Sequence, residues 1–421
     1  MKISTDSYKG VRDFYPEDMA VENQIFDIWK DVSRKYGYEE YNASVLEPAE
    51  LFKAKSGEEI ITKQTYTFTD RGDREVTLRP EMTPTVARMV AGKFRELAFP
   101  VRWFSIPNFF RYEQPQKGRL REFWQLNVDI FGVESLEAEV EVIQMAYDIT
   151  KKYGLTDADF EIRVNSRKIL DYITKHLYGL DEEKSLQMLK LIDKKNKVSK
   201  EAFAEGLTEL IGDKAEQALT LLNSQNFEEF SVNLNQSKEE HEGLREVKYV
   251  MNGLEKLGIT NIIFDQSITR GADYYTGVIF EVFDKNPENR RSVFGGGRYD
   301  DLLALFGGDK VTAVGFGAGD VVARDLMETY GKIAPFKSSA DIYICIFNKE
   351  QTGYAQDVAQ KLRASGKKVS LDYSFRKIGD QIKTADRLKI PNVIVIGEDE
   401  VKTGKLKIKN LETGEEKDLL I

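Results

Sequence analysis

The sequence predicts an α+β protein with a separate, smaller α/β domain at its C-terminal end. Two runs rich in aromatic and β-branched residues, Val101–Phe110 and Phe123–Phe131, flank a charged loop and predict an antiparallel strand pair. The stretch from about 166 to 246 is dominated by Lys, Glu, Leu, Ala and Ser at helical spacing, which predicts a helical insertion. Beyond residue 338, strand and helix patterns alternate, which is typical of an α/β unit.

The composition fits a globular chain and argues against several chemistries. The 421 residues include 61 Lys+Arg and 70 Asp+Glu, a formal charge of −9, and 41% of the residues are hydrophobic. One cysteine, Cys345, and two histidines, His176 and His241, exclude an internal disulfide and argue against a Ser-His-Asp triad or a multi-histidine metal centre. Without a signal-peptide core or a run of ~18 apolar residues, we expect a reduced, soluble, cytoplasmic protein with no membrane contact.

The elements of the larger domain follow from periodicity and from turn residues. Apolar residues from Ile25 to Tyr36 recur at helical spacing before Gly37, which predicts the first helix and its end. A later helix is expected to begin after Gly319, with Asp320 as its cap, and to end at Gly331. Between the insertion and this helix, we expect strands at 262–265, 274–283 and 292–294.

A linker at 331–339, which contains Pro335, leads into the second domain. We expect this domain to contain strands at 342–347, 369–371, 393–396 and 405–409, and helices at 352–365 and 381–388.

The loop FRYEQPQKGRLREF (110–123) is longer than most hairpin loops, and long loops often carry function. Arg111, Arg119 and Arg121 stand near the ends of adjacent strands, where guanidinium groups can fork onto phosphate oxygens. Phe123 offers a flat face to a base, and Glu113 can accept a hydrogen bond from an exocyclic amine. On its charge pattern alone, a solvated hairpin tip explains the loop equally well.

Two further segments carry polar groups beside apolar ones. In TLRPEMTPTVAR (77–88), Glu81 and Thr83 share one face of an extended chain and can bind an ammonium group, although a surface strand edge is the favoured interpretation of this segment alone. In RGADYYTGVIFE (270–281), Arg270 can reach a phosphate. Tyr274 and Tyr275 are expected to point to opposite faces, one into the core and one into a pocket.

Two glycine-rich segments follow. FGGGRYDD (294–301) permits close backbone approach to a ligand, with a glycine bulge as the alternative. AVGFGAGD (313–320) lacks the spacing of a dinucleotide-binding fingerprint, so its glycines are attributed to close packing at the start of a helix. The chain has no P-loop. Taken jointly, several arginines with an aromatic ring and tyrosines indicate a nucleotide-activating site in which positive charge, not acid–base chemistry, lowers the barrier.

At this point the motifs resemble those of the histidyl-tRNA synthetase family of class II aminoacyl-tRNA synthetases, over nearly the full length. KGVRDFYPED (9–18) resembles the opening motif and FRYEQPQKGRLREFWQ (110–125) resembles class II motif 2. RGADYYTG and GGGRYD resemble two histidine-specific signatures, and SFRKIGDQIKTAD with VIVIGEDE resembles the anticodon-binding domain. The resemblance implies a catalytic domain at 1–330 with an antiparallel sheet flanked by helices, a helical insertion at about 166–246, an anticodon-binding domain at 338–421 and a homodimer.

The implied activity is that of a histidine–tRNA ligase. L-histidine would be activated with ATP to histidyl-adenylate and then transferred to the 3′ end of tRNA(His). Mg²⁺ is expected on the outer phosphates of ATP, where water and phosphate oxygens supply most of its ligands, so no residue is assigned to a metal.

The resemblance also assigns roles by motif position. Arg111 and Arg270 would be catalytic, with Arg111 on the ATP α-phosphate and the histidine carboxylate, and Arg270 over the α-phosphate where other class II enzymes use a metal. Glu113 and Phe123 would bind adenine, and Arg119 with Arg121 would support phosphates or the tRNA end. The histidine-binding residues would be Glu81, Thr83 and Gln125 on the α-amino group, and Asp129, Tyr275 and Tyr299 around the imidazole.

Four positions depart from the family pattern. Ser44 stands where motif 1 usually has proline, at the dimer interface, and Gln114 stands where arginine is frequent, near the tRNA acceptor end. Asp129 replaces the usual glutamate and shortens the reach to the imidazole, which a water can bridge. Val322 stands where an arginine usually covers the adenine, and Arg324 lies about 200° around the helix from it. We therefore predict weaker clamping of adenine, with ATP held mainly by Arg111, Arg119, Phe123 and backbone.

The second domain carries its own physical signal. Residues 361–389 include nine Lys or Arg and three Asp, a local charge of +6 in a chain of −9. Such a basic face suits a phosphate backbone, although a lysine-rich, solvated helix pair gives the same run.

Two other functions compete with a synthetase. A catalytically silent paralogue, such as the regulatory subunit of ATP phosphoribosyltransferase, typically lacks the C-terminal domain and an intact RGxDYY segment, and both are present here. A general nucleotide-binding module leaves the basic domain without a role. The sequence therefore favours the synthetase.

Overall fold

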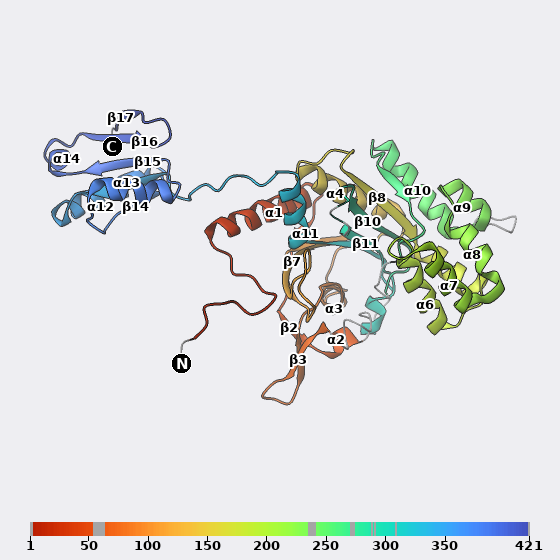
Figure 1. Cartoon of the computed structure of the whole chain (residues 1–421). Helices are drawn as coiled ribbons and strands as arrows, with labels where there is room; N and C mark the ends of the chain where they lie inside the picture. The colour runs from red at the N-terminus through yellow and green to blue at the C-terminus, as the bar shows by residue number, and fades with distance from the viewer. Residues whose placement is uncertain are drawn as a thin grey trace. The chain divides into compact units, whose positions relative to one another are not determined.

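The computed structural model describes residues 3–53, 64–234, 241–269, 274–287, 289, 292–307 and 310–419. The chain forms two compact units, Met1–Ile333 and Ala334–Ile421 (Figure 1). Each unit contains its own sheet and its own buried hydrophobic clusters. The candidate site lies in the first unit.

The first unit is built on a large mixed sheet, and most of its strand pairs are antiparallel. Only the outermost pairs of the described sheet, β1 with β5 and β8 with β9, are parallel. The strands lie in the order β1 (Glu39–Glu40), β5 (Val101–Ser105), β7 (Glu122–Phe131), β12 (Ala313–Gly319), β11 (Ser292–Arg298), β10 (Val278–Asp284), β8 (Phe160–Ser166) and β9 (Ile262–Phe264), while β6 (Asn108–Phe110) also pairs with β7. The predicted α+β class and the antiparallel pairing around the charged loop are confirmed.

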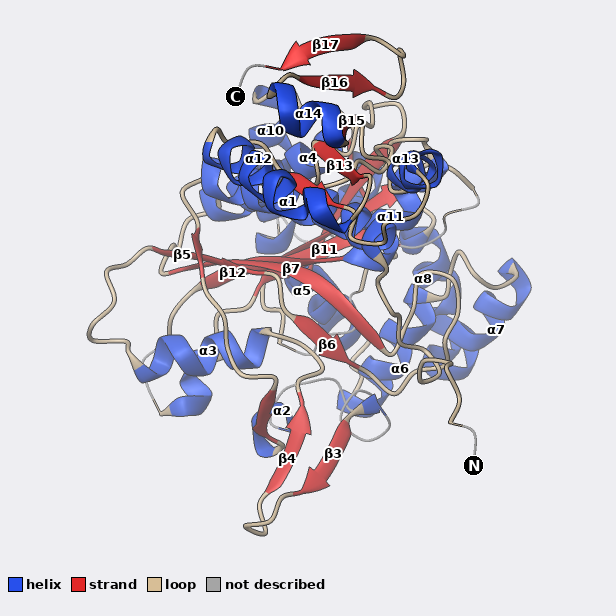
Figure 2. Cartoon of the chain, turned by 90° about the vertical axis from the view of Figure 1, so that its left-hand side faces the viewer, coloured by secondary structure: helices blue, strands red, loops and turns tan. Residues whose placement is uncertain are grey.

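Helices cover the two faces of this sheet. Figure 2 shows α1 (Pro16–Lys35) and α11 (Asp320–Thr329) over one face and α3 (Thr83–Gly92) beyond the other. The helix α4 (Glu137–Lys152) packs against α1 and β12. Ile25 and Trp29 of α1 are fully buried in this layer, and Gly37 ends the helix with φ of 76°.

Strand β7 separates the apolar core from the site. Successive side chains of a strand point to opposite faces of the sheet. Leu126, Val128 and Ile130 belong to the main hydrophobic cluster with α1 and α4. The alternate residues of β7 are polar, and this alternation directs a row of polar groups to the opposite face.

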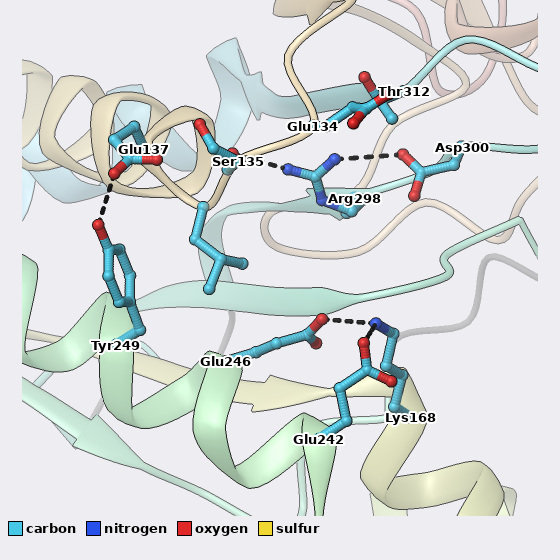
Figure 3. Close-up of a pocket in the computed structure, with 11 residues that line it drawn as sticks. Glu134, Ser135, Glu137, Lys168, Glu242, Glu246, Tyr249, Arg298, Asp300 and Thr312 are labelled. Carbon is cyan, nitrogen blue, oxygen red and sulfur yellow. Dashed lines mark hydrogen bonds and ion pairs between the residues drawn. The ribbon is translucent and has the colours of Figure 1, made fainter.

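The chain from 167 to 256 consists of helices and the short turns between them where it is described. It contains α5 (Arg167–Asp171), a π-helix (Tyr172–Leu177), α6 (Glu182–Asp193), α7 (Lys200–Ile211), a 3-10 turn (Gly212–Lys214), α8 (Ala215–Leu222), α9 (Phe227–Leu234) and α10 (Glu242–Lys256). Figure 3 shows how charges join its two ends: the Lys168 ammonium of α5 lies 2.9 Å from Glu242 and 2.5 Å from Glu246 of α10. These ion pairs line a cavity of about 510 Å³ where α10 approaches Arg298.

A smaller three-stranded sheet and short helices complete the first unit. The sheet has the order β2 (Leu46–Pro48), β4 (Glu75–Leu78) and β3 (Tyr66–Thr69), and the short helices are α2 (Glu50–Lys53) and a 3-10 turn (Leu303–Phe306).

Three local predictions are wrong. Gly319, not Asp320, is the N-cap of α11 and has no side-chain cap. Asp320 is the first helical residue; its fully buried side chain pairs with Arg12 and accepts the Trp124 N–H at 2.9 Å. The strand expected at 274–283 begins only at Val278, and the strand expected at 292–294 continues through the glycines to Arg298 because Gly295 and Gly297 pair with β12.

The second unit is an α/β sheet of five strands. β14 (Val369–Leu371), β13 (Ile342–Ile346) and β15 (Asn392–Ile396) are parallel, and β16 (Leu406–Asn410) and β17 (Glu416–Leu419) extend the sheet antiparallel. Its helices are a 3-10 turn (Lys349–Gln351), α12 (Thr352–Ala364), α13 (Ile378–Arg387) and α14 (Glu398–Thr403). The short, largely polar α14 and β17 were not predicted, because neither contains the apolar period on which the assignment depends.

None of the helices described in either unit combines the length and the apolar character needed to cross a membrane.

Candidate functional site

Two cavities of the first unit share one residue, Arg111. The small cavity has a volume of about 80 Å³ and the large cavity about 380 Å³. The small cavity is lined by Glu81, Thr83, Arg111, Gln125, Asn127, Asp129, Tyr274, Tyr275, Gly295, Tyr299, Gly315, Phe316 and Gly317. The large cavity is lined by Arg111, Glu113, Gly118, Arg119, Leu120, Phe123, Ser292, Gly319, Asp320, Val321 and Val322.

The polar face of β7 provides one wall of the small cavity. Gln125, Asn127 and Asp129 alternate along the strand and therefore share one face. Beside them on β12, Gly317 pairs with Asn127 and a Cβ built on it would lie 2.7 Å from the Gln125 amide nitrogen. A Cβ on Gly315 would overlap the Asp129 carboxylate. These glycines of AVGFGAGD therefore leave room for polar side chains, rather than serving the start of α11.

Asp129 is the buried carboxyl group of the small cavity, with 5% of its surface exposed. Its Oδ1 accepts a hydrogen bond from the Tyr299 hydroxyl. Burial raises the pKa of Asp129 to about 7, although this hydrogen bond acts in the opposite direction. Burial also holds the pKa of Tyr299 well above its ordinary value, so that its hydroxyl remains a donor. The cavity thus offers an acceptor whose charge changes near neutral pH.

Tyr274 and Tyr275 both line the small cavity, so the expectation that they face opposite sides is wrong. Their ring centres are 5.0 Å apart. The chain has not yet entered β10 at these residues, so strand alternation does not apply. The Tyr274 hydroxyl lies 3.3 Å from Glu81 Oε2 and 3.4 Å from Thr83 Oγ1.

Glu81 and Thr83 reach the cavity by a different route from the one expected. Thr83 is the first residue of α3, so the two side chains are not on one extended strand. Glu81 has 8% of its surface exposed. The turn before α3 brings both residues to the cavity.

The large cavity collects four of the predicted ATP-binding residues, Arg111, Glu113, Arg119 and Phe123. The Arg111 guanidinium carbon lies 5.2 Å from the centre of the Phe123 ring, and its Nε donates to the Pro80 carbonyl at 2.8 Å. Arg119 Nε lies 2.7 Å from Glu113 Oε2. The loop thus presents cations beside an aromatic ring.

Other arginines have different partners. Arg121 lines neither cavity; its Nε donates to the Glu113 carbonyl at 3.1 Å and its guanidinium carbon lies 4.1 Å from the Tyr112 ring centre. Arg324 also lines neither cavity and pairs with Asp18 and Glu328, both at 2.9 Å, whereas Val322 lines the large cavity. Arg270 lies outside the described residues.

The structure therefore brings most of the predicted site residues together around Arg111. The small cavity contains the predicted histidine-binding residues Glu81, Thr83, Gln125, Asp129, Tyr275 and Tyr299. The large cavity contains the predicted ATP-binding residues Glu113, Arg119 and Phe123. Sequence reasoning missed Asn127, and of the two adjacent tyrosines it assigned only Tyr275 to the site. Asn127 was detectable, because it lies midway between Gln125 and Asp129 on the same face of a strand.

Two family profiles together match most of the chain. The Histidyl-tRNA synthetase family profile matches residues 10–319, and the Anticodon binding domain profile matches 341–421. The chain is 42% identical over 415 residues to the histidine–tRNA ligase of Leptospira biflexa serovar Patoc, covering 97% of this chain and 94% of that protein.

Two solved structures share the fold. The histidyl-tRNA synthetase of Nostoc sp. PCC 7120 matches with a TM-score of 0.82 at 23% identity, covering 99% of this chain and 97% of that one. A protein of Bacillus halodurans C described as an ATP phosphoribosyltransferase regulatory subunit/histidyl-tRNA synthetase matches with a TM-score of 0.76 at 25% identity, covering 91% and 97%. From the profile match over most of its length and the identity to its curated relative, the chain belongs to the histidyl-tRNA synthetase family.

Proposed function

We propose that the chain is a histidine–tRNA ligase that holds histidine in the small cavity and ATP in the large cavity, with Arg111 between them. The position of Arg111 on the walls of both cavities carries this proposal. A guanidinium group there can contact the amino-acid carboxylate and the α-phosphate at once, and these are the two groups that react.

The first step forms histidyl-adenylate. A carboxylate oxygen of histidine attacks the α-phosphorus of MgATP in line, and pyrophosphate leaves with the electrons of the broken P–O bond. The attacking carboxylate is already ionised at neutral pH, so no general base is required. The task of the protein is to position the two anions and to stabilise the charge of the transition state. Arg111 supplies this charge, and Arg270 is assigned the same role by its place in the RGADYYTG motif.

Histidine is selected by groups at two ends of the small cavity. Glu81, Thr83 and Gln125 are assigned to the α-ammonium group, and the Tyr274 hydroxyl supports Glu81 from 3.3 Å. Asp129 is assigned to an imidazole N–H, with Tyr275 and Tyr299 around the ring. The hydrogen bond from Tyr299 orients the Asp129 carboxyl group for this contact.

The second step uses the 3′-terminal ribose hydroxyl of tRNA(His), which attacks the adenylate carbonyl and releases AMP. The second unit, which matches the anticodon-binding profile, is assigned to the anticodon end of the same tRNA. We assign the protein to the cytoplasm, as the sequence analysis predicts, and we propose that it is a homodimer, as the family resemblance implies.

The first test is histidine-dependent ATP–pyrophosphate exchange. The proposal expects exchange that requires histidine and falls by at least about a hundredfold in Arg111→Ala, since loss of one transition-state donor commonly costs 10²–10³ in rate. Arg270→Ala tests that residue separately, and activity unchanged by the substitution would remove its assignment.

The alternative function is that of a regulatory subunit, which the description of the Bacillus halodurans protein includes. Histidine binding without any pyrophosphate exchange in the wild-type chain would favour the regulatory function. The large cavity with its arginines beside Phe123 favours the ligase, because a silent histidine sensor has no need for a nucleotide site.

A further inference from the structure

The segment that precedes α1 lies against two walls of the large cavity. It runs from Tyr8 to Phe14 and contains turns but no helix or strand. Because such a backbone has no ladder of hydrogen bonds of its own, neighbouring groups must hold it in place. Its contacts reach the charged loop 110–123 on one side and the start of α11 on the other. We call residues 8–14 the strap.

The strap encloses Arg121 of the charged loop. Arg121 Nη1 donates to the Tyr8 hydroxyl at 3.0 Å and to the Lys9 carbonyl at 3.3 Å. The backbone N–H of Arg121 donates to the Gly10 carbonyl at 2.7 Å. The guanidinium carbon also lies 5.5 Å from the centre of the Tyr8 ring and 4.1 Å from the centre of the Tyr112 ring. The strap and a neighbouring ring therefore occupy this guanidinium group, which lines neither cavity.

Through Arg121, the strap holds the backbone of two residues of the large cavity. Arg121 Nε donates to the Glu113 carbonyl at 3.1 Å, and the Arg121 carbonyl accepts the Arg111 N–H at 2.9 Å. Gly10 permits this close approach, because its φ is 88° and a Cβ built on it would lie 2.8 Å from Pro115 Cγ and 2.9 Å from Arg121 Cγ. Any larger residue at this position would displace the loop. The place of Glu113 in the cavity thus depends on the strap.

At the other end of the strap, Arg12 is the partner of two buried carboxylates. Its guanidinium pairs with Asp320, the first residue of α11, and its Nη1 lies 3.4 Å from Glu22 Oε1 of α1. The side chains of Asp320 and Glu22 are 0% and 1% exposed. Asp320 also lines the large cavity and accepts the Trp124 N–H at 2.9 Å. Without its cation, this carboxylate would repel a triphosphate, so Arg12 makes the wall of the cavity compatible with an anionic ligand.

Aromatic contacts extend the strap to β7. The Arg12 guanidinium carbon lies 4.8 Å from the centre of the Phe14 ring. Phe14 in turn meets the Trp124 ring edge-on, with ring centres 5.3 Å apart and an angle of 85° between the rings. Trp124 directly follows Phe123, which lines the large cavity. The strap therefore contacts the charged loop, α11 and β7, which are three of the elements that line this cavity.

We propose that the strap is a positioning element for the ATP site. Arg121 fixes the charged loop, and Arg12 neutralises Asp320. Neither arginine lines the large cavity, so both act through the residues that do. For Arg121, this replaces the contact with phosphates or the tRNA end that the family resemblance implies. The inference rests on the proposed ligase function and adds to it residues that touch no substrate.

Arg121→Lys tests the loop side of the strap in ATP–pyrophosphate exchange. Lysine keeps the charge but lacks the Nε–H that holds the Glu113 carbonyl, so the KM for ATP should rise by about 5- to 30-fold while the KM for histidine stays the same. Gly10→Ala should also raise the KM for ATP, and the double variant should not exceed the larger single effect, because both changes act through one contact. Gly37→Ala is the control, since Gly37 has a similar φ of 76° and nothing lies within 4 Å of its Cβ.

Arg12→Met tests the α11 side of the strap. The charged and titratable groups around Asp320 and Glu22 are Arg12, Arg324 of α11 and Tyr153 of α4. Burial raises the pKa of Asp320, and removal of the Arg12 cation raises it further, so in the variant this carboxylate ionises only as the pH rises. The KM for ATP should therefore exceed the wild-type value by about 5- to 50-fold at pH 9 and by less at pH 7.

Asp320→Asn separates the charge from the structure. The amide keeps the size of the carboxyl group and can still accept the Trp124 N–H, so adding it to Arg12→Met should return the KM for ATP close to the wild-type value at every pH. Arg34→Met, at the end of α1 with a side chain 62% exposed, controls for the loss of a cation and should leave this KM unchanged. If Asp320→Asn restores nothing, Arg12 acts on ATP directly and its role as a positioning residue is wrong.

Two outcomes distinguish failure of this inference from failure of the ligase function. If the wild-type chain shows no exchange, the ligase function is wrong, and the strap is then tested by calorimetric titration of the same variants with MgATP, with the Kd in place of the KM. If Arg121→Lys and Gly10→Ala keep the wild-type KM for ATP, or if the KM for histidine rises equally, the strap supports the fold and not the ATP site. Either result would overturn the proposal.

Discussion

Asp129→Asn removes the charge of the small cavity while keeping its shape. A hydrogen bond to a charged group contributes about 1.5–3 kcal/mol, so the KM for histidine should rise by roughly 10- to 150-fold at pH 8. The imidazole lies at the opposite end of the amino acid from the reacting carboxylate. The kcat should therefore change little, which is the signature of lost ground-state binding.

The pH dependence of the same substitution follows from the burial of Asp129. Its pKa of about 7 means that the carboxyl group is mostly neutral at pH 6 and mostly ionised at pH 8. The ratio of the histidine KM of the variant to that of the wild type should therefore rise about tenfold from pH 6 to pH 8. This ratio also cancels the titration of free histidine, which both proteins share.

The assay is pyrophosphate exchange at saturating ATP, with histidine varied at each pH. Tyr299→Phe is the control. It removes the hydrogen bond that lowers the Asp129 pKa, so the pH at which Asp129 becomes half ionised, and with it the change in the histidine KM, should move to a higher value.

Ionised Asp129 also opposes folding, so Asp129→Asn should raise the melting temperature more at pH 8 than at pH 5. A KM ratio that stays near one at every pH would refute the assignment of Asp129 to the imidazole.

Three further substitutions test the site and its support. Gly317→Ala should raise the KM for histidine, because the added Cβ would lie 2.7 Å from the Gln125 amide nitrogen and displace it. Gly319→Ala is the control, since nothing lies near a Cβ at that position. Equal effects of the two substitutions on the histidine KM in exchange assays would contradict this prediction. Val322→Arg should lower the KM for ATP by about 2- to 30-fold through a cation over the adenine, and a large loss of exchange activity would show that the large cavity is organised otherwise. Arg298→Met should destabilise the fold by about 3–5 kcal/mol, because it leaves the buried Glu139 carboxylate without the guanidinium now 2.6 Å away. Adding Glu139→Leu should restore much of the melting temperature, and no recovery would mean that the ion pair is not the cause.

The sequence alone was sufficient to predict those site residues that lie close together along the chain. Arg111, Glu113, Arg119 and Phe123 lie within thirteen residues on one loop and the strand after it, so their convergence required only the predicted hairpin. The period of two along β7 likewise placed Gln125 and Asp129 on one face. The roles of these residues came from the family resemblance and stay predictions, as does that of Arg270.

The tertiary structure decided what depends on residues far apart in the chain. Two buried ion pairs, Arg298 with Glu139 and Arg12 with Asp320, form only when the sheet and its helices are assembled. The periodicity of the sequence predicts which face of an element a side chain lies on, but it does not predict which residue that side chain contacts. The expectation that Tyr274 and Tyr275 face opposite sides failed for a related reason: strand alternation was applied to a segment that precedes β10.

The second unit shows the same division. Phe347 and Tyr373 are visible in the sequence as aromatic residues after two strands, yet only the parallel register of β13 and β14 brings them to one edge. Local sequence determines which elements form and which faces are apolar, since propensity and periodicity act over a few residues. Which faces meet is decided by packing and strand pairing across the whole chain, where each contact depends on all the others.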